Sequence, residues 1–270
     1  MFMLPSDFAI VFWFYKEPEI AKNHLQLLRK HNPDYRVFGV FGGNPSEAGA
    51  YEEALGAGLD DFWTYPGTYG NDSRSKWIFG NLMLVDWYDK RGRDLPWKWK
   101  SIAITQWDML VFDDILNQLP GLRPGQVYFA GNRELDKTVE NQWAWTRPDG
   151  RHRHEYDEFV SLLAKEYGWY GPLRACVYLL EVLTREFFDE YMEVPNKKIG
   201  MLEYKDPTLA EVWGLNVYER DLGVNWGDWH TVEEAALIAR HGILVTDEFV
   251  REQLAKTDGW RIFHPSLSLW

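Results

Sequence analysis

The stretch Ser101–Asp114 reads SIAITQWDMLVFDD and carries the clearest information on the fold. It begins with an apolar run that is typical of a buried β-strand, and Gln106 and Trp107 end that run. Asp108 follows directly. Because ligands bind at the carboxyl ends of the strands in an open α/β sheet, the stretch predicts a central strand that presents Asp108 at a binding edge. Asp108 is then either a ligand for a divalent cation or a solvated acid that caps the following turn.

Strand and helix patterns alternate on the amino-terminal side of this stretch. Apolar strand patterns lie at residues 7–15, 35–43, 60–66 and 100–111. Helical patterns lie between them at residues 17–33, 45–58 and 73–92. Alternation of units of this size predicts an α/β fold with a mostly parallel sheet between helices.

The second half of the sequence is less regular. We expect strands at 126–135 and 173–183, and helices at 155–169, 184–193, 206–215 and 231–242. Asp113 and Asp114 are expected to begin the helix after the central strand. The polar segment 139–158 is predicted to be a loop over the site. Without a linker or a repeat, residues 1–270 are predicted to form a single domain with two halves, approximately 1–114 and 115–270.

Composition limits the class of protein. The chain has 270 residues, 46% of them hydrophobic and 26% charged, which is usual for a soluble globular protein. The formal net charge of −12 argues against nucleic-acid binding, which requires a basic face. No apolar stretch has transmembrane length, so we expect a soluble protein, with peripheral association at a membrane still open. The single cysteine, Cys176, fits a reducing compartment, and a cytoplasmic location is the expectation.

Several motifs are absent from the sequence. There is no G-x-G-x-x-G after the first strand, no phosphate-binding G-x-x-x-x-G-K-[ST], no G-x-S-x-G and no C-x-x-C. These absences argue against most dinucleotide oxidoreductases, P-loop enzymes, serine hydrolases and zinc-ribbon proteins. The 15 tryptophans slightly favour a sugar or nucleotide ligand, since aromatic faces stack on sugar rings and bases.

The order of several segments resembles that of GT-A-type glycosyltransferases. The tripeptide QWD at Gln106–Asp108 stands where that family has its DxD motif, although Gln106 replaces the first acid. The segment Gly171–Glu193 resembles the acceptor-side segment of the family, and Gly200–Val217 resembles the segment that places an acid before a helix. The resemblance implies a GT-A-like, Rossmann-type sheet with an irregular acceptor-side second half. It also implies a nucleotide-sugar donor, bound by the first half, and a carbohydrate or glycoconjugate acceptor.

The resemblance further implies a metal site and a catalytic base. The last acid of the motif, Asp108, is expected to bind Mn²⁺ or Mg²⁺, and His264 near the carboxyl terminus is expected to complete the metal shell. Glu203 is the first candidate for the general base and Asp206 the second, in front of a helix that we expect to open at Pro207. Both acids could instead simply favour the helix N-terminus through its dipole.

The nucleotide-sugar site is expected at the ends of the first strands and the start of the long helix. The start of that helix suits an anion because its backbone N–H groups are free. The remaining candidates flank the base, the ribose and the motif. The predicted nucleotide-sugar-binding residues are Phe14, Tyr15, Gly42, Gly43, Arg74, Lys76, Gln106 and Trp107.

The leading hypothesis is therefore a metal-assisted glycosyltransferase, inverting if a carboxylate reaches the acceptor hydroxyl and retaining if none does. A nucleotidyltransferase is the first alternative, although FYKEPE after the first strand is not the basic glycine-rich loop such enzymes usually carry. The second alternative is a degenerate, non-catalytic relative that binds carbohydrate through its tryptophans. Gln106 is the best support for this reading.

Overall fold

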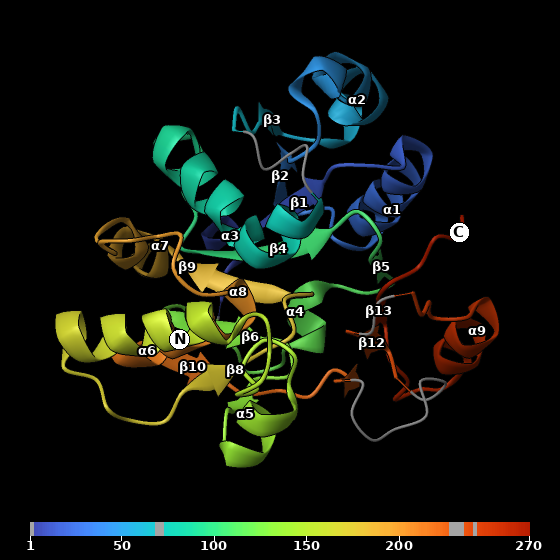
Figure 1. The fold of residues 1–270 in the computed structure, drawn as a ribbon. Helices are drawn as coiled ribbons and strands as arrows, with labels where there is room; N and C mark the ends of the chain where they lie inside the picture. Colours follow the sequence, from blue (N-terminus) through green and yellow to red (C-terminus); the bar gives the residue numbers. More distant parts are fainter. Residues whose placement is uncertain (1–2, 68–72, 227–234, 240–241) are drawn as a thin grey trace.

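The structure is a computed structural model that describes residues 3–67, 73–226, 235–239 and 242–270, without the side chains of residues 73–75 and 77. Its centre is a seven-stranded sheet in the order β10-β6-β9-β4-β1-β2-β3 (Figure 1). Six strands run in the same direction and β9 is antiparallel to both of its neighbours. The strands are β1 (Phe8–Phe14), β2 (Arg36–Phe41), β3 (Asp61–Thr64), β4 (Ser101–Gln106), β6 (Gln126–Phe129), β9 (Glu181–Thr184) and β10 (Asn216–Tyr218).

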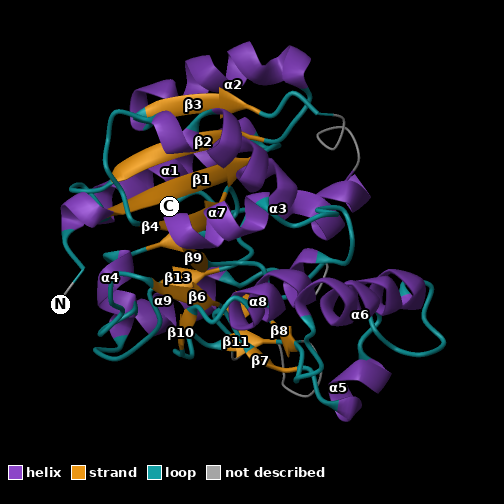
Figure 2. Cartoon of the chain, turned by 90° about the vertical axis from the view of Figure 1, so that its left-hand side faces the viewer, coloured by secondary structure: helices purple, strands orange, loops and turns teal. Residues whose placement is uncertain are grey.

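Helices cover both faces of the sheet, as the side view in Figure 2 shows. The strand β1 explains why, because all seven of its residues are buried and they alternate between two hydrophobic clusters. Trp13 belongs to the cluster beneath α3 (Ser73–Lys90), α6 (Arg153–Tyr167), α7 (Arg185–Met192) and α8 (Leu202–Val212). Phe14 belongs to the opposite cluster, beneath α1 (Pro18–His31), α2 (Ala48–Leu55) and α4 (Ile115–Gln118). The predicted fold class, a mostly parallel sheet flanked by helices, is confirmed.

Short elements complete the fold. A third apolar cluster joins α9 (Asp247–Ala255) to the small sheet of β5 and β13. The other helix is α5 (Lys137–Gln142), and 3-10 turns lie at Pro5–Asp7, Pro45–Glu47, Gly56–Gly58 and Gly92–Asp94. The two-residue strands are β5 (Leu110–Val111), β7 (Arg133–Glu134), β8 (Arg174–Ala175), β11 (Val224–Asn225), β12 (Leu237–Ile238) and β13 (Ile262–Phe263).

The chain changes direction in the sheet between β1 and β4. After β1 it forms β2 and β3 on one side, and it then returns to place β4 on the other side of β1. The two carboxyl ends at this reversal are Phe14 and Gln106. A crevice outside such a reversal is the usual ligand site of an open α/β sheet. No helix among the described residues is long and apolar enough to cross a membrane.

Five predictions in the second half need correction. The strand expected at 126–135 is divided into β6, which ends at Phe129, and β7, which pairs with β8 in a separate sheet. The helix expected to open at Pro207 begins at Leu202 and contains the proline, so Glu203 and Asp206 lie within its first turns rather than before it. The strand expected at 173–183 is interrupted, because residues 176–180 form a turn between β8 and β9. The described part of the helix expected at 231–242 contains the strand β12. The loop expected at 139–158 lies partly in α5 and α6.

Candidate active site

A cleft of about 530 Å³ lies at the carboxyl ends of β1 and β4. It is therefore at the reversal point of the sheet, where the topology alone predicts a ligand. Its lining combines polar and charged groups with apolar residues, several of which come from the carboxyl-terminal segments. The polar and aromatic residues that line it are Trp13, Tyr15, Lys16, Lys76, Gln106, Trp107, Asp108, Trp145, Tyr178, Glu203 and His264.

Asp108 and His264 meet in this cleft. Asp108 follows β4 in a tight turn, and its carbonyl accepts a hydrogen bond from the backbone N–H of Ser266 at 2.8 Å. His264 follows β13, which pairs with β5 directly after that turn. This pairing brings His264 Nε2 to 3.3 Å from Asp108 Oδ1. The two groups form an ion pair only when the imidazole is protonated.

The pair fits part of a divalent-cation site. Asp108 Oδ1 and His264 Nδ1 are buried atoms for which the described part of the chain provides no hydrogen-bond partner. A carboxylate oxygen and an imidazole nitrogen are both suitable ligands for Mn²⁺. Among the described residues there is no group of three or more His, Cys, Asp or Glu side chains that could hold a metal ion. The protein would thus supply two ligands, and the remaining ligands would come from the substrate or from water.

Two lysines and two aromatic rings line the cleft beside Asp108. Lys76 Nζ lies 4.2 Å from the centre of the Tyr15 ring, and Lys16 Nζ lies 4.8 Å from the centre of the Trp107 ring. Burial and, to a smaller extent, the negative charge of Asp108 raise the pKa of Tyr15 to about 12, so its hydroxyl stays protonated. The wall therefore presents two cations and a hydroxyl donor, which is a suitable environment for a phosphate group.

Glu203 lines the same cleft from the first turn of α8. Pro207 fixes the local geometry, because it has no N–H to bond the carbonyl four residues earlier, which is that of Glu203. The backbone N–H of Cys176 donates to this free carbonyl at 2.8 Å. Helix α8 is also bound to β8 through Thr208 Oγ1, which accepts from the N–H of Arg174 at 2.9 Å and donates to its carbonyl at 3.2 Å.

The carboxyl group of Glu203 is half-buried and has a shifted pKa. Burial raises the pKa to about 7, and the Tyr178 backbone N–H, 3.4 Å from Oε1, opposes that shift. A carboxylate with a pKa near the working pH is well suited to accept a proton.

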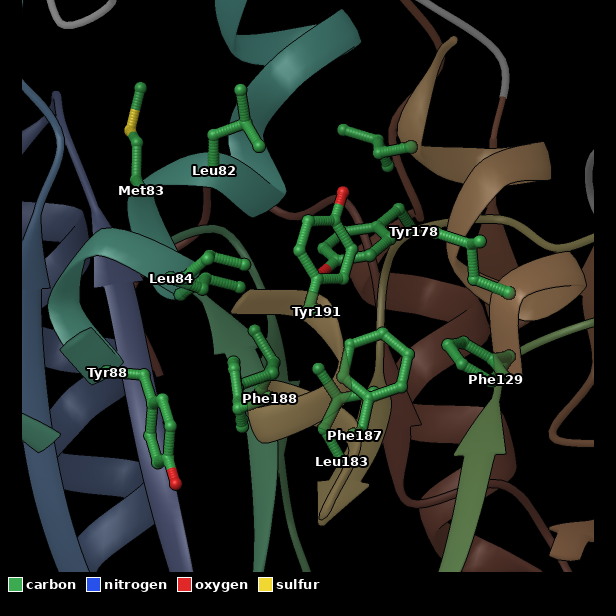
Figure 3. Packing of buried hydrophobic residues seen from close by; sticks show 14 of the residues in the cluster. Leu82, Met83, Leu84, Tyr88, Phe129, Tyr178, Leu183, Phe187, Phe188 and Tyr191 are labelled. Atoms are coloured by element: carbon green, nitrogen blue, oxygen red, sulfur yellow. The ribbon is translucent and has the colours of Figure 1, made fainter. Parts of the chain in front are cut away.

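Asp206 lies deeper, on the same helix. It is fully buried and does not line the cleft, and its Oδ1 accepts a hydrogen bond from Asn81 Nδ2 at 2.6 Å. Burial raises its pKa, as it does for Glu181, which is also fully buried. Figure 3 shows the apolar cluster around Tyr178 and Tyr191 in this part of the protein. Asp206 thus makes hydrogen bonds inside the protein, whereas Glu203 reaches the cleft.

The predicted nucleotide-sugar residues divide into two groups. Tyr15, Lys76, Gln106 and Trp107 line the cleft. Phe14, Gly42 and Gly43 are buried and do not line it.

The two glycines are required by packing. A Cβ at Gly42 would lie 2.9 Å from Trp13 Nε1, and one at Gly43 would lie 3.0 Å from the Tyr15 carbonyl oxygen. They allow the chain to pass close behind the cleft wall. The side chain of Arg74 lies outside the described part of the structure.

Among the polar and aromatic lining residues, four were not predicted: Trp13, Lys16, Trp145 and Tyr178. Lys16 could have been predicted, because it directly follows the expected first strand. The carboxyl end of that strand lies at the edge of the sheet where ligands bind. Trp13 lies within the continuous apolar run of β1, so the sequence does not distinguish it from the core residues of that strand. Tyr178 lies in a segment that was predicted to be a continuous strand.

Comparison with known proteins gives similarity in structure and none in sequence. No protein-family model and no curated protein sequence matches the chain. A crystal structure of the galactosyltransferase LgtC with donor and acceptor sugar analogs has 12% identity and a TM-score of 0.45, over 96% of this chain and 87% of that chain. Mouse xyloside xylosyltransferase 1 in its apo form has 13% identity and a TM-score of 0.45, over 98% of this chain and 99% of that chain. An active-site mutant of LgtC has 13% identity and a TM-score of 0.42, over 96% and 87%.

Proposed function

We propose that the protein is a metal-assisted glycosyltransferase that moves a sugar from a nucleoside-diphosphate sugar to an acceptor hydroxyl. One observation carries the proposal. A single cleft at the reversal point of the sheet holds the Asp108–His264 pair and, separately, the carboxyl group of Glu203. Sugar transfer needs these two functions: neutralisation of a departing diphosphate, and removal of a proton from the attacking hydroxyl.

The donor side of the proposed site is the wall formed by β1 and β4. Asp108 and His264 would hold Mn²⁺ or Mg²⁺, which when bound neutralises the charge that develops on the leaving diphosphate. Lys16 and Lys76 face the same space and would contact phosphate oxygens. The amino-terminal half would thus bind the nucleotide sugar.

The acceptor side is the wall formed by α8. Glu203 would accept the proton of the acceptor hydroxyl while the oxygen forms a bond to the anomeric carbon. The bond from that carbon to the phosphate oxygen breaks, and its electron pair leaves with the nucleoside diphosphate. Attack on the face opposite to the leaving group inverts the anomeric configuration. Asp206 is not assigned this role, because it is fully buried behind the cleft.

A thermal-shift assay tests the donor site. UDP or GDP with Mn²⁺ should raise the melting temperature by about 5 °C at saturation, and nucleotide without metal should have a smaller effect. The variant Asp108→Asn should lose the metal-dependent part. Asp34→Asn is the matched control, since Asp34 is exposed and does not line the cleft. If no nucleoside diphosphate stabilises the protein with either metal, the proposal is wrong.

A turnover assay separates the alternatives. Release of UDP or GDP from a panel of nucleotide sugars, with methyl or nitrophenyl glycosides as acceptors, is the expected activity. Formation of pyrophosphate from a nucleoside triphosphate and a sugar phosphate would identify a nucleotidyltransferase instead. Tight glycan binding that requires neither nucleotide nor metal would identify a carbohydrate-binding protein.

A further inference from the structure

A tight turn centred on Tyr178 lies between the two sides of the cleft. The backbone N–H of Leu179 donates to the carbonyl of Val177 at 2.8 Å, which closes a three-residue turn. The turn is fixed to the end of β6, because Val177 N–H donates to the Ala130 carbonyl and Ala130 N–H donates to the Leu180 carbonyl. In such a turn the central residue keeps its own N–H and carbonyl for other partners.

The partners of Tyr178 come from the two sides of the proposed site. Its N–H faces Glu203 Oε1 at 3.4 Å, and its carbonyl accepts a hydrogen bond from Gln106 Nε2 at 2.5 Å. Gln106 is the last residue of β4, two positions before Asp108. One backbone residue is thus hydrogen-bonded to the donor wall and to the acceptor wall. We call Gln106, Tyr178 and Glu203 the Tyr178 bridge.

A third hydrogen bond limits how far Glu203 can move relative to the turn. The N–H of Cys176 donates to the Glu203 carbonyl at 2.8 Å, which Pro207 leaves free. The backbone and the side chain of Glu203 are therefore both bonded to residues 176–178. The bond from Gln106 then determines where this turn lies relative to Asp108.

We propose that Gln106 is a positioning residue, which through the Tyr178 peptide sets the position and the ionisation of Glu203 relative to Asp108. The inference rests on the proposed function. It also explains why the first residue of QWD, at position 106, is a glutamine. The contact to the Tyr178 carbonyl requires a hydrogen-bond donor, and an ionised carboxylate has none. An acid at position 106 would face a carbonyl oxygen and repel it.

Burial and the Tyr178 N–H are the two causes that shift the pKa of Glu203. The Tyr178 N–H favours the carboxylate, so a displaced turn raises the pKa of Glu203 further. Burial and, in addition, the negative charges of Glu203 and Asp206 raise the pKa of Glu181 from β9 and the pKa of Cys176. Lys205 directs its ammonium group to the Lys197 carbonyl. Across the cleft the charged or titratable lining groups are Tyr15, Lys16, Lys76, Asp108 and His264.

Two variants test the role of Gln106. Gln106→Glu restores an acid of the motif but loses the donor, and Gln106→Met loses the donor without adding charge. In both variants, kcat for nucleotide-sugar turnover is expected to fall about tenfold. The acidic limb of the kcat–pH profile of Gln106→Met should move to higher pH. A purely structural role would lower the melting temperature without moving this limb.

The outcomes distinguish this inference from the proposed function. If wild-type protein shows neither nucleotide stabilisation nor turnover, the proposed function fails. If wild-type protein is active and Gln106→Glu has an equal or higher kcat, the positioning role is wrong. The same holds if Gln106→Met keeps the wild-type kcat and pH profile.

A measurement on the wild-type protein covers the case in which the variants do not fold. The side-chain amide signals of Gln106 and the backbone amide signal of Tyr178 can be followed by NMR as pH is changed. Both should shift with the midpoint of the acidic limb of kcat, because both report on the bridge. Signals of Gln106 that do not respond at that midpoint would overturn the inference.

Discussion

Glu203 has a carboxyl group whose ionised form is unfavourable in the folded protein. Burial raises its pKa from 4.5 to about 7. Between these two values the folded state binds more protons than the unfolded state, so this group lowers the free energy of unfolding as pH rises. The full cost is present above pH 7 and is absent well below pH 4.5. For the proposed role of Glu203 as the base, activity should rise as pH passes about 7.

The variant Glu203→Gln tests both consequences. It should abolish turnover, and at pH 8 it should raise the free energy of unfolding by about 1–3 kcal/mol relative to wild type. At pH 4.5 the two proteins should have nearly equal stability. Urea unfolding at the two pH values measures this, with Glu53→Gln at an exposed position as the control. A glutamine variant that is less stable than wild type at pH 8 would contradict the argument.

Within helix α8, Thr208 helps to hold Glu203 in position although Thr208 itself does not line the cleft. Thr208 is fully buried, and its hydroxyl bonds both backbone groups of Arg174 in β8. Thr208→Val keeps the shape but leaves a buried N–H and a carbonyl without that partner. The free energy of unfolding should fall by about 2–3 kcal/mol. Denaturant unfolding checks this, and Thr208→Ser, which keeps the hydroxyl, should lose less.

The elements of the first half could be predicted because each has a local signal. The strand β1 is a continuous apolar run, and α1 begins at Pro18 and ends with basic residues. In the second half, the helix expected at 184–193 is present as α7, and the Thr184 hydroxyl at its start accepts a hydrogen bond from the Phe187 N–H. The start of α8 could not be predicted in the same way. Pro207 usually opens a helix, but here a residue distant in sequence, Cys176, bonds the carbonyl that the proline leaves free.

At the scale of the whole molecule, the sequence predicted which edge of the sheet carries the cleft. It predicted less well which residues and turns form the cleft. Tyr15, Gln106 and Asp108 lie where strand ends were expected, and Glu203 and His264 reach the same cleft. The direction of β9 and the turn at Tyr178 depend on pairing with β4 and β6, which no local pattern contains. The buried positions of Gly42 and Gly43 likewise result from packing against Trp13 and Tyr15.

The carboxyl-terminal segment that contains His264 is hydrogen-bonded to α1, which lies near the amino terminus. Asn23 Nδ2 donates to the Trp270 carbonyl at 2.8 Å, and Trp270 N–H donates to Asn23 Oδ1 at 2.8 Å. The His24 ring lies between the carbonyls of Trp107 and Ser268, at 3.0 and 2.9 Å. This segment therefore connects α1 to both sides of the Asp108–His264 pair.

Asn23→Ala should loosen this connection. Amide hydrogen exchange at Ser268 and Trp270 should become faster, and the affinity for Mn²⁺ in the presence of UDP should fall by roughly tenfold. The free energy of unfolding should change by only about 1 kcal/mol. Lys22→Ala, at an exposed position of the same helix, is the control. Unchanged exchange and affinity would show that the segment does not depend on Asn23.

Asn23 in α1 and Trp270 are 247 positions apart in the sequence, and their contact affects when the site can form during synthesis. A chain that grows from its amino terminus produces β1, α1 and β4 long before His264. Because folding during synthesis proceeds from the amino-terminal side, the central strands can assemble on the ribosome before His264 is available to pair with Asp108. Chains that have not yet formed residues 262–270 would therefore contain the central strands without the pair, and the proposed transfer reaction would require this segment to fold back onto α1.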